Sequence, residues 1–430
     1  MKFNRKHRIN QRIERISPQH LVVGIDIAKE THVAGAVNYR GIEVDHTCSF
    51  TNDRVGFEKM MHWVTQQQQR LGLTRVILGM ESTGHYGNAL ARWLQDHGQE
   101  VVQVNPATVK RNKENRDNRP SKNDAKDALT IADSISRGYY HDWSWHEGTY
   151  RKLRCVVNEY EALSTDLTAI GNRLQRLLDE GFPEFLRVFK KWNGPRAIAT
   201  LKAFPLPEDL KHRTIEQVIE GWRTTAMSRA GGKRGREIAA RLLAAARASV
   251  GVTDIAPELR RNIQRLLEQR ERLLADQEQV MNEILALLGQ LPEADLAALK
   301  EVGISPWLTA VILANTGPLS QYAHGQQILA LAGLNLCEDM SGKRKGQIVL
   351  SKRGRRQLRK YLYVAMIGLV ANHEAFRAWH DHNVHTRRIK KQTSIFKLIG
   401  KLVRMLVALA RNGESFDAGK AQALKLRTAA

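Results

Sequence analysis

The order of apolar runs in the N-terminal third constrains the fold of this chain more than any other sequence feature. Three short β-type runs come first, at 21–27 (LVVGIDI), 31–37 (THVAGAV) and 42–50 (IEVDHTCSF). Only a few residues separate them, which is typical of consecutive antiparallel strands. Helical and strand patterns then alternate over 55–71, 75–80, 88–98, 100–105 and 123–136. The sequence therefore predicts the element order βββαβαβα.

Strands first, followed by alternating helices and strands, indicates a mixed sheet flanked by helices. This is the order of ribonuclease-H type folds. We therefore predict an α/β domain over residues 21–140. Residues 1–20 carry six Lys or Arg against the single acid Glu14, and we expect them to form a flexible basic arm that can lie along phosphates.

Two long helical patterns follow this domain. In each, apolar residues recur with steps close to three and four, from Leu153 to Leu177 and from Leu259 to Leu287. Such spacing predicts coiled-coil helices that pair within one chain or between subunits, and ordinary amphipathic helices on a core are the alternative. We place this region at 141–295, with an insertion at about 183–255 in which no chemistry can be named.

The remaining third is expected to be a mostly α-helical domain over 296–415, followed by a tail over 416–430. The longest uncharged apolar run, 361–371, is too short to span a bilayer, so we expect no membrane segment. Three cysteines far apart indicate neither a disulfide framework nor a cysteine zinc site, which fits a reducing cytoplasm.

The charge balance points to a polyanionic partner. Lys and Arg number 67 against 44 Asp and Glu, a formal net charge of +23. Such an excess creates a surface field that attracts nucleic acid. A ribosome-like or merely soluble basic protein is the simpler alternative.

Four acids of the predicted α/β domain are candidates for a metal site. Asp26 lies inside an apolar run, where an unpaired charge is costly unless a cation compensates it. Glu81 follows directly on the run 75–80, at a strand end where open sheets place ligand-binding residues. Asp124 and Asp127 are three apart on a predicted helix and so share one face. Hard cations such as Mg²⁺ prefer carboxylate oxygens, so we expect a Mg²⁺ or Mn²⁺ site for phosphodiester chemistry.

These acids have two alternative interpretations. Asp124 and Asp127 also suit an ordinary helix start, where the helix dipole favours negative charge. A Gly-Ile-Asp turn also begins the fold of sugar kinases and actin-like ATPases. Those proteins duplicate the fold and carry further Gly-rich phosphate loops, and we find neither in this sequence.

The segment 341–360 is a candidate nucleic-acid-binding block. It contains nine basic residues and no acid, so it should bind a phosphate backbone in a salt-dependent way. Ser341 precedes Gly342 and this basic cluster, and it is the preferred candidate for a nucleophile. Ser351 is the rival, although its position is that of a cap for the following helix. The nine basic residues are Lys343, Arg344, Lys345, Lys352, Arg353, Arg355, Arg356, Arg359 and Lys360.

Taken together, these motifs resemble the DEDD-type insertion-sequence transposases, which pair a RuvC-like N-terminal domain with a serine-bearing C-terminal domain. The resemblance rests on GIDIAKETH at 24–32, ESTGHYG at 81–87 and the segment 104–128, and distally on two further blocks. The distal blocks are LKEVGISPWLTAVILANTG and LAGLNLCEDMSGKRKGQIVLSKRGRRQLRKYLY. One departure is Asn123, where the family more often has Thr.

The resemblance implies specific roles and partners. Asp26, Glu81, Asp124 and Asp127 would bind metal, and Ser341 would be the nucleophile. The stretch VGISPWLTAVILA would form a helix-hairpin-helix, although Ser305 stands where a second glycine is usual. The partners would be donor and target DNA and a bridge RNA of the element, with a homodimer or homotetramer acting in the bacterial cytoplasm at the nucleoid.

Two rival functions remain open at this stage. A metal-dependent nuclease such as a junction resolvase needs the four acids without Ser341, whereas a non-catalytic scaffold needs only the basic surfaces. His380, His382 and His385 have spacing suggestive of a metal site, but no cysteine or acid completes a zinc pattern beside them.

Overall fold

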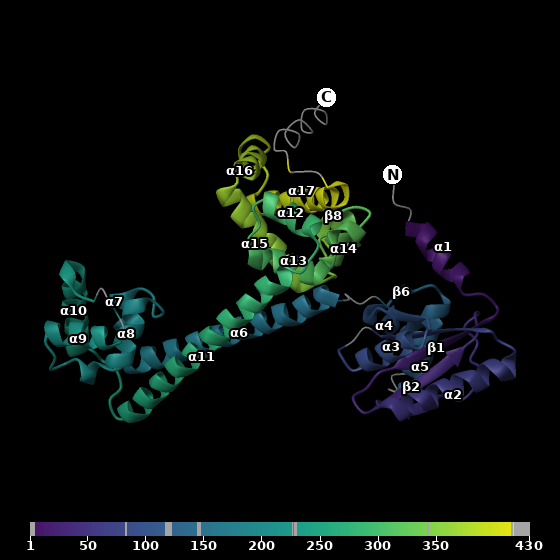
Figure 1. Ribbon diagram of the computed structural model, residues 1–430, viewed down its shortest axis with the longest axis horizontal. Coiled ribbons are helices and arrows are strands. Elements are labelled where there is room, and N and C mark those ends of the chain that lie inside the picture. The colour runs from purple at the N-terminus through teal and green to yellow at the C-terminus, as the bar shows by residue number, and fades with distance from the viewer. Residues whose placement is uncertain are drawn as a thin grey trace. The chain divides into compact units, whose positions relative to one another are not determined.

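The computed structural model describes residues 5–81, 84–116, 123–143, 148–225, 227, 230–341, 344–413 and 416. The chain divides into two compact units, Met1–Trp145 and His146–Ala430 (Figure 1).

The first unit is built on a six-stranded mixed sheet with the strand order β3-β2-β1-β4-β5-β6. Strands β1, β4 and β5 are parallel, while β2, β3 and β6 run antiparallel to their neighbours. This confirms the predicted mixed α/β architecture. The strands are β1 (His20–Asp26), β2 (Thr31–Val37), β3 (Cys48–Thr51), β4 (Arg75–Glu81), β5 (Val101–Val104) and β6 (Tyr140–Asp142).

Helices cover both faces of this sheet. Successive strand residues point to opposite faces, so each face contributes apolar side chains that a helix layer buries. Leu21, Val23 and Ile25 of β1 belong to a core shared with α2 and α3, whereas Val22 belongs to a core shared with α4 and α5. The helices of the unit are α1 (Arg5–Arg15), α2 (Arg54–Leu71), α3 (Gly87–Asp96), α4 (Pro106–Arg116) and α5 (Asp124–Ser136).

The N-terminal segment differs from the flexible arm that the sequence predicts. It forms α1, and Arg15 at its end makes ion pairs with Asp142 (2.5 Å) and Glu100 (2.7 Å). The hydroxyl of Tyr140 donates to the Arg12 carbonyl at 3.0 Å. The prediction of a free arm was therefore wrong for this segment, because bonds to β6 and to the residue before β5 hold the end of the helix.

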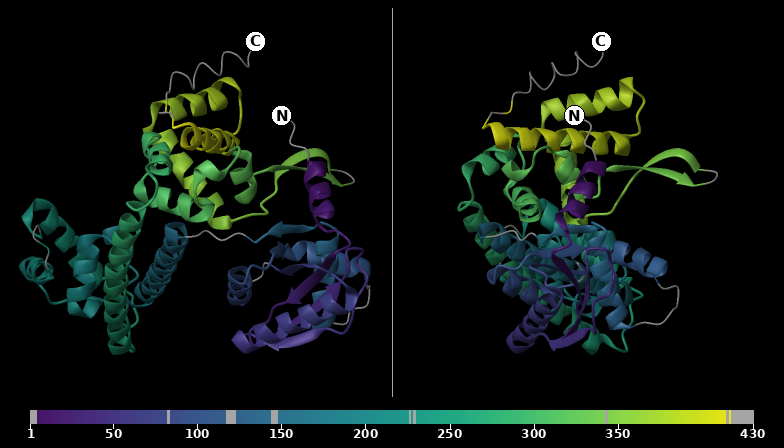
Figure 2. Two further views of the ribbon diagram at one scale, coloured as in Figure 1. Left: turned by 45° about the vertical axis from the view of Figure 1, so that its right-hand side comes forward. Right: turned by 90° about the vertical axis from the view of Figure 1, so that its right-hand side faces the viewer.

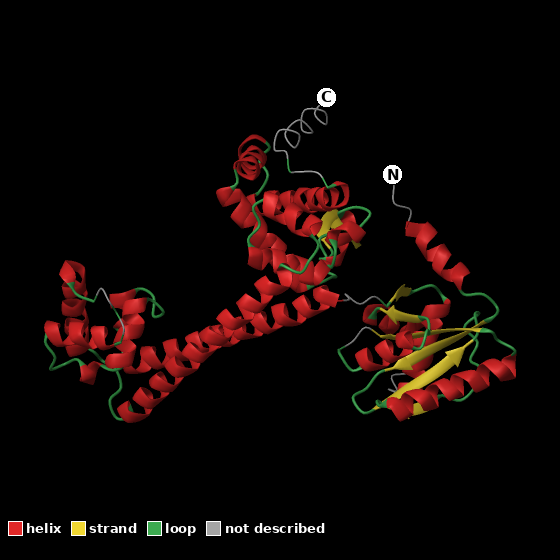
Figure 3. Ribbon diagram, viewed as in Figure 1, coloured by secondary structure: helices red, strands yellow, loops and turns green. Residues whose placement is uncertain are grey.

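The second unit is largely helical (Figure 3) and contains two long helices. They are α6 (Gly148–Gly181) and α11 (Ala256–Leu288). The N-terminal part of α6 shares a core with the C-terminal part of α11, and the opposite ends share another, so the pair is antiparallel. The two predicted helices therefore pair within one chain.

Between α6 and α11 lies a small helical module, defined here as residues 182–255. Its core includes Phe182, Phe185 and Trp222 and continues into the adjoining turns of the long helices. The sequence offered no interpretation here, yet the segment is folded. Its helices are α7 (Phe185–Phe189), α8 (Pro195–Ala203), η1 (Pro207–Asp209), α9 (Ile215–Thr224) and α10 (Gly232–Arg247).

The other end of the long helices packs into a core with the C-terminal helices. A two-stranded antiparallel hairpin, β7 (Leu336–Ser341) and β8 (Arg344–Leu350), extends from these helices (Figure 2). None of the helices among the described residues is long and apolar enough to cross a membrane. The helices of this part are α12 (Glu293–Glu301), α13 (Pro306–Thr316), η2 (Leu319–Gln321), α14 (Gln326–Leu331), α15 (Arg356–Asn372), α16 (Glu374–Asp381), η3 (His382–Thr386) and α17 (Lys391–Asn412).

Candidate active site and nucleic-acid-binding residues

A row of three glycines sets the position of α5 on the sheet. Gly24 of β1 lies beside Gly35 of β2 and Gly79 of β4 in the strand register. A Cβ atom added at Gly24 would stand 2.2 Å from the Ala128 carbonyl oxygen and 2.3 Å from the Ala132 nitrogen. Because only glycine leaves that space, the backbone of α5 lies directly on β1.

The same strands place two acids at one edge of the sheet. Asp26 and Glu81 are the last residues of β1 and β4, which are parallel neighbours with Ile25 opposite Met80. Each acid follows a glycine of the row by two residues. Since strand side chains alternate, both acids point to the face that α5 covers.

The start of α5 brings the other two acids to this edge. Asn123 caps the helix, its side chain accepting a hydrogen bond from the Ala125 N–H at 3.0 Å. Asp124 and Asp127 occupy the first turn, directly before Ala128, which lies over Gly24. The predicted helix over 123–136 is thus confirmed, and its first turn lies near the ends of β1 and β4.

The pKa values of the strand acids reflect this proximity. Burial, followed by the negative charges of Asp127, Asp124 and Glu81, raises the pKa of Asp26 to about 6. Burial and the charge of Asp127 also raise the pKa of Glu81. All four predicted acids therefore lie close enough to interact, and their shared negative charge is incompletely compensated.

One cation of the chain already contacts this pocket. Lys113 of α4 donates to Asp127, with 2.5 Å between Nζ and Oδ1. Lys113 is not predictable from the sequence, because a partner fourteen residues away across a polar segment leaves no periodic signal. Asn112 beside it is buried and donates to Asp133 (2.8 Å) and Ser134 (3.0 Å), which fixes α4 against α5.

The donor chemistry of the pocket fits a hard divalent cation. Four carboxylates with one lysine leave a net negative charge, and such cations prefer oxygen ligands. In the described part of the chain, however, no three His, Cys, Asp or Glu side chains are close enough together to hold one ion. The acids share a pocket, but their oxygens are not gathered around a single point.

Ser341 lies on a separate element, the β7–β8 hairpin. It is the last residue of β7 and pairs with Arg344 at the start of β8. Gly342 and Lys343 lie outside the described residues, as do the side chains of Ser341, Arg344 and Lys345. The backbone thus places the predicted nucleophile at the tip of a hairpin beside the start of the basic block.

Ser351, the rival nucleophile, does not cap the following helix as its position suggested. Its hydroxyl bonds to Asn335 Oδ1 at 2.5 Å, while its N–H donates to the Asn335 carbonyl at 2.9 Å. Arg355 is the N-cap residue of α15, without a side-chain cap. Ser351 therefore closes the base of the hairpin, and the prediction that it caps the helix was wrong.

Comparison with known families matches both ends of this architecture. Residues 23–183 match the DEDD transposase family of IS110 elements, and residues 298–381 match the transposase IS116/IS110/IS902 family. The two matches stand in the order that the sequence motifs suggested. The chain belongs to the DEDD transposases of the IS110 family.

Individual relatives agree with this assignment. The uncharacterized protein of insertion element IS116 from Streptomyces clavuligerus is 26% identical over 346 residues, covering 80% of this chain and 83% of that protein. Its counterpart from insertion element IS110 of Streptomyces coelicolor is 24% identical over 321 residues, 69% of this chain and 72% of that protein. A pilin gene-inverting protein from Moraxella lacunata is 31% identical over 110 residues, 26% of this chain and 32% of that protein. The IS110-family chain is thus an enzyme, a DNA transposase or recombinase.

The basic block of this transposase divides into residues facing solvent and residues held by the protein. Lys352, Arg353 and Arg356 are exposed. The Arg359 Nη1 donates to the Ala332 carbonyl at 2.8 Å, and the Arg355 guanidinium donates to the Asn315 carbonyl.

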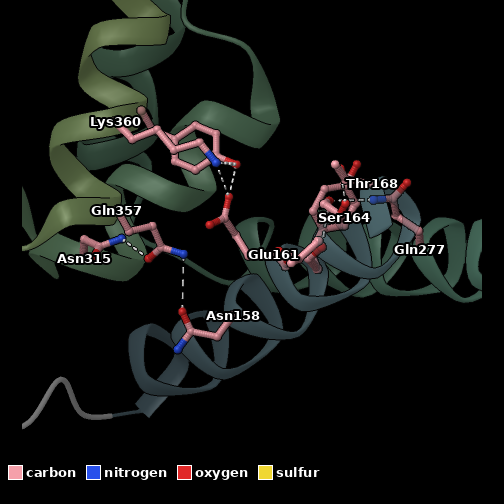
Figure 4. Close-up of polar contacts among 11 residues, drawn as sticks. Asn158, Glu161, Ser164, Thr168, Gln277, Asn315, Gln357 and Lys360 are labelled. Carbon is pink, nitrogen blue, oxygen red and sulfur yellow. Dashed lines mark hydrogen bonds and ion pairs between the residues drawn. The ribbon is translucent and has the colours of Figure 1, made fainter. Parts of the chain in front are cut away.

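Lys360, the last residue of the block, contacts the long helix α6 (Figure 4). Its Nζ pairs with Glu161 at 3.0 Å, and the Tyr361 hydroxyl donates to the same carboxylate. Next to it, Gln357 accepts a hydrogen bond from Asn315 at 2.8 Å. The predicted DNA-binding block therefore also fastens α15 to α6 and α13.

The predicted helix-hairpin-helix stretch forms the end of α12, a turn and α13. Gly303 in the turn has a φ of +84°, a conformation that favours glycine. Ser305, in place of the second glycine, is the N-cap of α13, and its hydroxyl accepts from the Leu308 N–H at 3.5 Å.

Proposed function

We propose that this IS110-family transposase cleaves and rejoins DNA with two groups of residues: the carboxylates Asp26, Glu81, Asp124 and Asp127, and the hydroxyl of Ser341. The observation that carries the proposal is the electrostatic coupling of the four acids at the edge of the sheet. A half-buried cluster of acids with one lysine to compensate part of its charge is costly to stability, and such clusters are typical of functional sites.

The carboxylates would hold Mg²⁺, or Mn²⁺. Such an ion, when bound, supplies Lewis-acid stabilisation of charge on a DNA phosphate. Two residues of the chain affect metal binding here. Burial favours the protonated form of Asp26, so this carboxyl must lose a proton when it binds a metal, and Lys113 neutralises part of the charge of Asp127. Glu81 and Asp26 are fixed by adjacent strands, so their spacing is set by the sheet.

Ser341 would carry the covalent step. Its Oγ forms a bond to phosphorus, the bond from phosphorus to one bridging oxygen of the DNA strand breaks, and that leaving oxygen takes the serine proton and becomes a free hydroxyl. The resulting phosphoserine ester conserves the phosphodiester, and a hydroxyl of a second strand displaces the serine to rejoin DNA. The basic sequence that follows Ser341 supports this assignment because cations stabilise charge on the attacked phosphate.

The partners and assembly belong to the same proposal. The resemblance implies donor and target DNA, a bridge RNA that pairs with both, and a homodimer or homotetramer in the cytoplasm at the nucleoid. We also propose that α6 and α11 pack as a coiled coil, which their three-and-four spacing and antiparallel contact support.

The test is a search for a covalent protein–DNA adduct. The full chain with its co-purified RNA is incubated with labelled DNA carrying the element's ends, with Mg²⁺ or with EDTA. We expect an adduct in the wild type and in Ser351→Ala, and none in Ser341→Ala. Asp26→Asn should also fail to form it while binding DNA normally.

Other results would identify a rival. Strand cleavage that persists in Ser341→Ala without an adduct would indicate a metal nuclease of the junction-resolvase kind. Binding without any cleavage, with either metal and with RNA present, would indicate a scaffold.

A further inference from the structure

Apart from its first two residues, the helical module at 182–255 lies between the two family matches, which cover 23–183 and 298–381. It nevertheless carries much of the positive charge of the chain. Fourteen Lys or Arg stand against seven Asp or Glu between 182 and 255, an excess of seven out of the total of +23. Nine of the fourteen basic residues lie on the helices α7 to α10, which pack around one core.

Helix α10 presents the largest basic face of the module. It has 16 residues and lies at the end of the long helix pair (Figures 1 and 3). Arg234 and Arg241 are two turns apart along one side of its exposed face, and Arg236 and Arg247 lie along the other side. The residues between these two rows are small or basic, apart from one acid, and all are exposed: Lys233, Glu237, Ala240, Ala244 and Ala248.

The adjacent turn after α7 adds to this positive surface. The Arg241 guanidinium donates to the Arg187 carbonyl at 3.2 Å, which ties α10 to α7. Lys190 and Lys191 follow at the end of α7 and are exposed, and Lys190 holds a φ of +52°. Neither lysine makes an ion pair within the described residues.

Among the described residues, the acids of the module compensate only one of the four arginines on this face, Arg236. Glu216 is engaged by Arg236 at 2.8 Å, and Glu184 accepts from the Ser249 hydroxyl at 2.6 Å. Glu237 is the one acid on the exposed face of α10. Beside this face, burial and the positive charge of Arg234 lower the pKa of Arg196, as expected where cations accumulate.

We propose that the exposed face of α10, with Lys190 and Lys191, is a docking surface for the phosphate backbone of duplex DNA. Two arginine rows separated by alanines let a helix approach a duplex closely, with cations toward phosphates on both sides. The major groove of B-form DNA is wide enough for an α-helix, whereas the corresponding groove of an RNA duplex is deep and narrow, so DNA fits this helical face better. The inference is independent of the metal and serine assignments.

The test uses the full-length protein and two charge-matched double variants. Ala240→Glu/Ala244→Glu puts two negative charges in the middle of the surface on a helix that tolerates glutamate. Gln175→Glu/Gln264→Glu adds the same charge at exposed positions of α6 and α11. Affinity for a duplex DNA of about three helical turns and for an RNA duplex is measured between about 50 and 200 mM salt.

We expect Ala240→Glu/Ala244→Glu to weaken binding about tenfold at low salt and to flatten the salt dependence, whereas the control stays within about twofold. Ala240→Lys/Ala244→Lys should tighten binding. The loss should be larger for the DNA duplex than for the RNA duplex, and a loss confined to RNA would overturn the assignment of DNA as the ligand. Photo-cross-linking of wild type should yield adducts on peptides from 232–248.

Equal affinities of the two glutamate variants, with no cross-link on those peptides, would overturn the proposal. Adduct formation is scored separately with Asp26→Asn and Ser341→Ala. The binding result can therefore be interpreted even if the proposed cleavage chemistry is wrong, and the cleavage result can be interpreted even if α10 does not bind the duplex.

Discussion

The acidic edge of the first unit and the basic block of the second differ in how separation along the chain relates to position in the fold. The four acids come from segments up to a hundred residues apart and converge on one pocket. The nine basic residues lie within twenty positions, yet the fold separates them: Lys352 and Arg353 face solvent, while Arg355 and Lys360 bind the protein itself.

This difference shows that proximity in sequence is a weaker guide to a site than strand register. A half-buried acid at a strand end has its direction fixed by the pleat and by the element packed above it. A basic run that enters a helix is distributed around its circumference, so part of it meets neighbouring helices.

The largest effect should come from breaking the glycine row under α5. Gly24→Val places a side chain where the Ala128 carbonyl and the Ala132 nitrogen stand, so α5 must shift. We expect a loss of about 3 kcal/mol in the unfolding free energy of the first unit, measured by urea denaturation.

Gly98→Ala is the matched control in the same unit. Gly98 has a φ of +71° and open space around it, so only about 1 kcal/mol of backbone strain should appear. A cost for Gly24→Val no greater than for Gly98→Ala would contradict the close approach of α5.

The next effect concerns the protonation of Asp26. Its pKa rises from 3.8 to about 6 in the folded state, so the folded state binds the extra proton between these values. Without divalent metal, stability should fall as pH rises through this window, by about 2 to 3 kcal/mol for wild type. Asp26→Asn should remove that loss and be more stable than wild type at pH 8, but not below pH 4.

Adding Mg²⁺ sharpens this comparison. The ion should restore stability to wild type at pH 8 and leave Asp26→Asn nearly unchanged, as measured by denaturation with Mg²⁺ or EDTA. Identical pH profiles for the two proteins would mean that Asp26 is not in the charged cluster described above.

The basic block should show smaller, position-dependent effects. Arg355→Gln removes a charged donor from the Asn315 carbonyl, and we expect it to cost about 1 to 3 kcal/mol of stability. The measurement is denaturation of the full chain. If the variant is as stable as wild type, Arg355 is available to bind DNA instead.

The smallest effects on stability separate the two ends of the block. Lys360→Gln breaks a partly exposed ion pair with Glu161 and should cost less than about 1 kcal/mol. Arg353→Gln should leave stability unchanged and reduce the salt dependence of DNA binding by about one unit of slope. The reverse pattern would show that the assignment of inner and outer residues is wrong.

The parts of the fold that the sequence predicted are those with strong periodicity. The strands ending at Asp26 and Glu81 and the helix bearing Asp124 and Asp127 lie where their patterns indicated. Helix α4 was missed because its sequence is polar without a repeating apolar face, and β6 because it has three residues.

Long-range polar contacts could not be predicted in the same way. The pairing of Lys113 with Asp127 and of Lys360 with Glu161 depends on how helices pack, which no local pattern encodes. Each of three predicted strands contains a glycine, so the sequence shows that the glycines are present. That they lie side by side in the sheet follows only from the strand register.

The most direct test of the carboxylate pocket is a calorimetric titration of the full-length protein with Mn²⁺ and Mg²⁺. We predict binding to wild type and at least about tenfold weaker binding to Asp26→Asn and Glu81→Gln. The exposed-acid control Asp96→Asn, whose carboxylate pairs with Arg92, should bind as wild type does. Unchanged binding in both variants, or no binding by wild type, would contradict the proposal that these carboxylates bind a divalent metal.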